Sequence, residues 1–141
     1  MSLKFSASEL QHHLDASPFH KQFALRVTSV DGQAQVLTLL MPFSAALERA
    51  PGSGQFHGGA IASFIDIAGD FALVALLAVP IPTINFRVDY LRPATGSFLL
   101  AHARVRRMGK AVAVVDVEVQ DAEKRLVALG RGCYGTQASA T

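Results

Sequence analysis

The stretch His57-Gly-Gly-Ala-Ile-Ala-Ser-Phe-Ile-Asp66 opens the one long apolar segment of this 141-residue chain. Apolar residues continue from Ala60 to Val79, which predicts a long helix that the protein buries on most sides. The two glycines leave the first backbone N–H groups of the helix unpaired and open to close approach. Such a helix start binds an oxygen that carries developing negative charge. Asp66 lies eight positions after Gly58, about two turns along, so the carboxylate and the helix start share a face.

Upstream of this helix, the sequence predicts a short helix and a β-hairpin. A capping box at 6–9, followed by apolar residues at helical spacing, predicts a helix over about 8–15. Across 23–41, apolar and polar residues alternate on both sides of the turn signal Asp31-Gly32, which is typical of a hairpin. A helical turn and a loop are expected between 43 and 55, where the chain leads into the long helix.

Downstream of the helix, the sequence predicts only strands. Pro80 and Pro82 end the helix because proline lacks the N–H donor that would continue it. The expected strands are Thr83–Leu91, Phe98–Met108, Val115–Gln120 and Leu126–Tyr134. We expect these four to form an antiparallel meander. A sheet that curls around the helix buries most of its apolar surface, so the prediction is an α+β hotdog fold, an antiparallel sheet wrapped around one long central helix.

Length and composition limit the classes of protein to which the chain can belong. Half of the residues are apolar, which is enough for a single domain over 1–141, with a disordered tail expected at about 137–141. Thirteen basic and eleven acidic side chains give a formal net charge of +2. A nucleic-acid binder is expected to carry a strongly basic face, so this balance argues against nucleic acid as a partner.

The cysteine and charge pattern also bears on location and on metals. Cys133 is the only cysteine, so neither an internal disulfide nor a thiolate metal cluster is expected, and a reducing, cytoplasmic location is predicted. No signal peptide is recognised at the N-terminus. Asp66 and Asp70 are costly in hydrocarbon, which argues against a membrane-spanning helix. The five histidines show no ligand spacing, and we expect no metal or other cofactor.

Three pieces of the sequence carry a resemblance to a known family. The stretch from His57 to Asp66 is similar to an HGG-to-acid signature, and Thr83-Ile-Asn-Phe-Arg-Val-Asp-Tyr-Leu-Arg-Pro93 is similar to a strand that supplies a Ser or Thr to the facing subunit's site. Gly109-Lys110 resembles a strand turn near the CoA phosphates. In this order, the pieces resemble the hotdog thioesterases of the phenylacetate-degradation (PaaI-like) type, in the 4-hydroxybenzoyl-CoA thioesterase superfamily.

The resemblance implies hydrolysis of an aryl- or short- to medium-chain acyl-CoA. Gly58 matches the glycine whose N–H binds the thioester oxygen, and Asp66 matches the carboxylate that activates water or attacks the carbonyl. His57 matches a positioning histidine, and Thr83 of the partner subunit would orient the water. The implied assembly is a homodimer or homotetramer with sites at the subunit interface. The residues expected to bind substrate are Gly59, Arg92, Arg107, Gly109 and Lys110.

Two positions leave alternatives open. Many relatives carry Asn or Gln six residues before the histidine, but this chain has Pro51, so a non-catalytic acyl-CoA-binding module is the alternative function. Ser53 and Gln55 are the loop residues that can substitute for the missing amide. Asp70, four residues after Asp66, either shares a proton with it or lines the edge of the site or a dimer contact. The motifs of hotdog dehydratases are absent.

Overall fold

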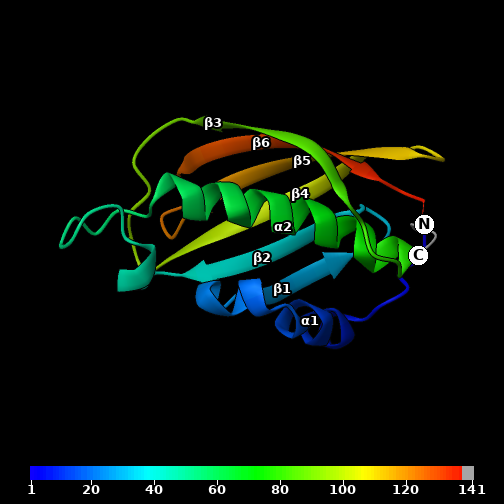
Figure 1. Ribbon diagram of the computed structural model, residues 1–141, viewed down its shortest axis with the longest axis horizontal. Helices are drawn as coiled ribbons and strands as arrows, with labels where there is room; N and C mark the ends of the chain where they lie inside the picture. The colour runs from blue at the N-terminus through cyan, green and yellow to red at the C-terminus, as the bar shows by residue number, and fades with distance from the viewer. Residues whose placement is uncertain (138–141) are drawn as a thin grey trace.

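The computed structural model describes residues 1–137, and its centre is a curved sheet with one long helix against it (Figure 1). The helices are α1 (Ala7–Ala16) and α2 (Gly58–Leu77), with short 3₁₀-helices η1 (Pro18–Phe23) and η2 (Ala45–Leu47). The strands are β1 (Arg26–Asp31), β2 (Val36–Pro42), β3 (Thr83–Tyr90), β4 (Phe98–Met108), β5 (Val112–Asp121) and β6 (Leu126–Gly135). Positions 138–141 of the predicted disordered tail lie outside the described residues.

The sheet has six antiparallel strands in the order β1-β2-β4-β5-β6-β3. The prediction of a four-strand meander after the helix is therefore wrong for β3. Strand β4 pairs with β2 on one side, from Val36–Arg104 to Pro42–Phe98, so the position beside β4 is already taken. The backbone groups of β3 find their partners on β6 instead. As a result, β3 forms an edge of the sheet.

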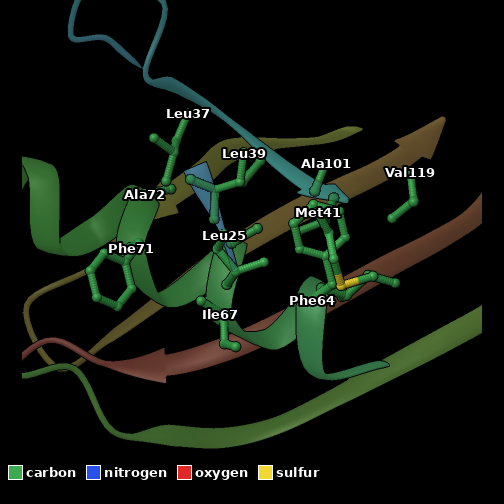
Figure 2. Close-up of a cluster of buried hydrophobic side chains, with 14 of the residues drawn as sticks. Leu25, Leu37, Leu39, Met41, Phe64, Ile67, Phe71, Ala72, Ala101 and Val119 are labelled. Carbon is green, nitrogen blue, oxygen red and sulfur yellow. The ribbon is translucent and has the colours of Figure 1, made fainter. Parts of the chain in front are cut away.

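Helix α2 lies in the concave face of the sheet, as the prediction of a hotdog fold requires. Figure 2 shows α2 side chains in contact with the inner faces of β2, β4 and β5. The labelled residues of this cluster are Phe64, Ile67, Phe71 and Ala72 of α2, Leu37, Leu39 and Met41 of β2, Ala101 of β4, Val119 of β5, and Leu25. Burial of these side chains is the main force that holds helix and sheet together. The predicted fold class is confirmed.

The boundaries of α2 differ slightly from the prediction of 60–79. The helix begins at Gly58, because His57 caps it, and it ends at Leu77, where Ala78 takes the left-handed conformation (φ 55°). By length and hydropathy α2 is able to cross a membrane, but 67% of its most apolar segment is buried inside the protein. Helix α2 is thus the core helix of this fold. The hairpin predicted over 23–41 begins only at Arg26, since η1 takes up Phe23.

Strand β3 exposes an unusual number of apolar side chains. Ile84, Phe86 and Tyr90 are 56%, 40% and 53% exposed, and Leu91 just after the strand is 49% exposed. Within the described residues, no strand lies on the outer side of β3. An open edge strand with apolar side chains is a surface that natural monomers avoid.

Candidate active site

Within residues 1–137, one backbone amide at the start of α2 has no hydrogen-bond acceptor. The His57 side chain accepts a hydrogen bond from the Gly59 N–H at 2.8 Å, and the His57 carbonyl accepts from the N–H groups of Ala60 and Ile61 at 3.0 and 3.2 Å. Among the residues that the structure describes, no acceptor is paired with the N–H of Gly58. The helix therefore presents the Gly58 N–H at its positive end.

His57 and Gly59 act together in this cap. To accept the Gly59 N–H, the His57 Nδ1 atom must be unprotonated, so a neutral His57 holds the helix start. In the structure His57 is the N-cap of α2, and its positioning role in catalysis stays a prediction. Gly59 is a predicted substrate-binding residue, and its N–H is already paired with His57.

Tyr90 closes over the helix start, a contact that the sequence analysis did not identify. Its hydroxyl donates to the Gly58 carbonyl at 2.6 Å. A methyl group added at Gly58 would lie 3.3 Å from the Tyr90 ring, a tight contact for which the ring would have to move by a few tenths of an ångström. Desolvation raises the pKa of Tyr90, which keeps its hydroxyl protonated as a donor.

Asp66 is held two turns further along α2. The Thr83 hydroxyl donates to Asp66 Oδ1 at 2.9 Å, and both residues belong to the same chain. Thr83 therefore contacts the Asp66 of its own subunit, and the expectation that Thr83 of a partner subunit orients the water stays a prediction. The Asp66 carbonyl also accepts a hydrogen bond from the hydroxyl of the fully buried Tyr134, at 3.3 Å. The carboxylate is thereby fixed at the start of β3.

Asp70 lies one turn after Asp66 in a less favourable environment. Its Oδ1 atom is buried and has no hydrogen-bond partner among the described residues. Burial, and secondarily the charge of Asp66, raise the pKa of Asp70 to about 7. Asp70 therefore changes charge near neutral pH, while Asp66 carries the contact to Thr83.

A groove of about 510 Å³ begins beside the helix start. Its lining is mostly apolar with two arginines: Arg49, Gln55, Phe56, Gly58, Ile61, Tyr90, Leu91, Arg92, Pro93 and Ala94. Of the predicted substrate-binding residues, Arg92 lies here. Ser53 and Gln55 accept hydrogen bonds within the loop: the Ser53 hydroxyl accepts from the Ala50 and Gln55 N–H groups, and Gln55 Oε1 accepts from Arg49 Nε.

Arg107, Gly109 and Lys110 lie elsewhere in the chain. Arg107 lies at the end of β4 and the other two in the turn between β4 and β5, at the end of the molecule opposite to the start of α2 (Figure 1). Gly109 forms a tight turn in which its N–H donates to the Val112 carbonyl at 3.0 Å. One chain alone does not bring this turn to Gly58.

A second groove, of about 480 Å³, lies against β3, β5 and β6. Arg131 and Arg106 on its wall both pair with Asp116, at 2.6 and 2.8 Å, so one carboxylate compensates one of their two positive charges. Cys133 also lines this groove and is only partly buried. None of the residues predicted to act on substrate lies in it.

Residues 53–128, more than half of the chain, match the protein family described as the Thioesterase superfamily. The chain belongs to the thioesterase superfamily. The prediction of a PaaI-like hotdog thioesterase is confirmed, and with it the prediction of a thioester hydrolase.

The similar proteins include several from bacteria and archaea. A provisionally named esterase of Halobacterium salinarum is 38% identical over 121 residues, which cover 78% of this chain and 80% of the relative. The acyl-coenzyme A thioesterase PaaI of Escherichia coli is 29% identical over 113 residues, covering 79% and 77%. Its solved structure has a TM-score of 0.80 at 25% identity and 94% coverage of both chains. The medium/long-chain acyl-CoA thioesterase YigI of Escherichia coli is 32% identical over 93 residues, which cover 55% of this chain and 60% of YigI.

Proposed function

We propose that this protein hydrolyses acyl-CoA thioesters to a free acid and CoA, with aryl or short- to medium-chain acyl groups as the substrates. The observation that carries the proposal is the unpaired Gly58 N–H at the start of α2, directly beside a groove. The names of PaaI and YigI support CoA as the thiol part of the substrate. The reaction requires only water and the thioester, without a cofactor, and we expect it to take place in the cytoplasm.

In the proposed reaction, the thioester carbonyl oxygen binds to the Gly58 N–H. Negative charge grows on this oxygen when the carbonyl carbon is attacked, and a fixed amide at a helix start stabilises that charge. His57 contributes by holding the first turn of α2 in place. The C–S bond then breaks, and the CoA sulfur leaves and takes up a proton.

Asp66 is the proposed base or nucleophile. As a base, its carboxylate takes a proton from the water that attacks the carbonyl carbon. As a nucleophile, it forms an anhydride that water then hydrolyses. In both cases the hydroxyl of Thr83 keeps the carboxylate in one orientation through the 2.9 Å hydrogen bond.

The distance along α2 favours an arrangement in which the two functional groups serve different subunits' sites. Eight residues of helix separate Gly58 from Asp66 by about 12 Å. When a carboxylate attacks a carbonyl that is bound to an amide, the amide nitrogen and the carboxylate oxygen lie about 7 Å apart. When a water molecule attacks in its place, the same two atoms lie about 10 Å apart. We therefore propose that the Gly58 N–H of one subunit works with Asp66 of the other.

The exposed edge of β3 supplies the geometry for this arrangement. Thr83, at the start of β3, contacts Asp66, and Tyr90, at its end, contacts Gly58. When two copies of β3 pair antiparallel, the start of one strand lies beside the end of the other. The Asp66–Thr83 pair of each subunit then faces the helix start of its partner. The apolar side chains of β3 would be buried in the same contact.

The test of the proposed function is CoA release from a panel of aryl-, short- and medium-chain acyl-CoAs. We expect wild-type turnover with at least one substrate class and loss of turnover in Asp66→Asn. Tight binding of the CoA esters without release would instead favour the binding module, which Pro51 and the engaged Ser53 and Gln55 side chains leave as the alternative.

A further inference from the structure

One peptide unit at the start of α2 is held from both of its ends. The N–H of the Gly58–Gly59 peptide donates to His57 Nδ1 at 2.8 Å, and the carbonyl of the same peptide accepts from the Tyr90 hydroxyl at 2.6 Å. His57 belongs to the cap of the helix, whereas Tyr90 comes from the end of β3, 32 positions after Gly58. The two contacts together form a clamp that joins the helix to the edge strand.

The clamp matters because of the residues that it holds. Glycine has more backbone freedom than any other residue, and the first turn of a helix is the part that frays. Two successive glycines at that place would allow the Gly58 amide to turn away from a bound carbonyl. Fixing the adjacent peptide unit restricts the torsion angles of Gly58 and so fixes the direction of its N–H.

We propose that Tyr90 is a positioning residue of the oxyanion site, whose hydroxyl aligns the Gly58 amide for the thioester oxygen through its bond to the Gly58 carbonyl. This inference rests on the proposed role of Gly58. Tyr90 does not need to touch the reacting atoms for this role. Its ring is one wall of the groove at Gly58, so the hydroxyl and the ring have separable effects.

The surroundings of Tyr90 separate positioning from a purely structural role. The side chain is 53% exposed, so its hydroxyl contributes little to the stability of the isolated chain. Its hydrogen bond lies at the groove and not in the core. Removal of the hydroxyl alone is therefore expected to change the rate of the chemical step more than folding or substrate binding.

The variant that tests this is Tyr90→Phe, which keeps the ring. We expect kcat for acyl-CoA hydrolysis to fall about three- to tenfold, the effect of losing one neutral hydrogen bond, with KM changed less than twofold. The matched control is Thr28→Val, which removes a hydroxyl that donates to the Thr38 carbonyl at 3.0 Å, far from the site, and which should keep the wild-type kcat. The melting temperature of both variants is measured alongside.

Three results would overturn the proposal. An unchanged kcat in a folded Tyr90→Phe variant would show that the hydroxyl does not align the amide. A rise in KM with an unchanged kcat would make Tyr90 a binding contact, and an equal fall of kcat in Thr28→Val would show a general effect of the substitutions. Failure of the proposed function is recognised separately, because then the wild-type protein releases no CoA at all.

Discussion

Asp70 is the carboxyl group whose pKa the fold raises most. Its pKa is raised from 3.8 to about 7, chiefly by burial, so the folded protein holds a proton that the unfolded chain releases. Stability attributable to this group is therefore fully present below about pH 4, falls as the pH rises toward 7, and is level above that.

The corresponding prediction concerns Asp70→Asn, which cannot ionise. Its free energy of unfolding relative to wild type should increase between pH 4 and pH 7, by at most about 4 kcal/mol. Urea unfolding at a series of pH values measures the difference. A difference that does not vary with pH would mean that Asp70 titrates normally in the folded protein.

For Asp66, the account predicts a loss of activity without a loss of fold. Asp66→Asn keeps an oxygen that can accept from Thr83 but removes the base, and kcat should fall about 10²- to 10⁴-fold. Asp70→Asn, measured beside it at pH 6, should retain most of the activity. Loss in Asp70→Asn alone would move the base one turn along the helix.

At the scale of elements, the contact between α2 and β6 limits the size of the residue at position 69 of the helix. A side chain at Gly69 would collide with the Tyr134 hydroxyl, so the helix approaches the strand only because position 69 has none. Gly69→Ala should destabilise the protein by about 1–3 kcal/mol, although alanine favours the helix by about 1 kcal/mol. Thermal unfolding of Gly69→Ala alone and combined with Tyr134→Phe checks this, because removal of the colliding hydroxyl should recover part of the loss.

Strand β3 is the element on which the proposed assembly depends. Ile84→Lys places a charge on the exposed apolar edge and is expected to shift the protein from dimer to monomer and to abolish CoA release. Phe19→Lys, at a side chain 53% exposed on η1, is the control and should leave the dimer intact. Sedimentation velocity measures both. A dimeric Ile84→Lys variant would contradict pairing through β3.

At the scale of the whole molecule, the local pattern predicts the elements and not all of their neighbours. The predicted strand Phe98–Met108 has the same bounds as β4, and the predicted strand Thr83–Leu91 is one residue longer than β3. These predictions succeed because alternating polarity and turn residues are features of a few neighbouring positions. Strand β3 lies beside β6 because β2 already pairs with the free edge of β4. No short stretch of sequence contains this information.

The same limit applies to the site. Gly58 and Asp66 are found from one motif on one helix, whereas the contacts of Thr83 with Asp66 and of Tyr90 with Gly58 span 17 and 32 positions. Both depend on where β3 lies. The rise of about 12 Å between Gly58 and Asp66 follows from the sequence as well. The proposal of a site shared between two subunits also needs the open edge of β3, which only the structure shows.

A cross-subunit site predicts that two inactive chains restore each other. Gly58→Pro removes the N–H at the first helical position, where proline is tolerated, and His57 before it is already extended (φ −64°, ψ 138°). Gly58→Ala, which retains the N–H, is the control for the added atoms. A mixed dimer of Asp66→Asn and Gly58→Pro chains contains one site with both groups intact.

The decisive measurement is CoA release by this mixed dimer, purified with a different affinity tag on each chain. The account predicts about half of the wild-type activity per dimer, because one of two sites is complete, while each parent homodimer is inactive. Activity no higher than that of the parents, in a mixed dimer shown to be intact, would contradict the account and place Gly58 and Asp66 in the same subunit's site.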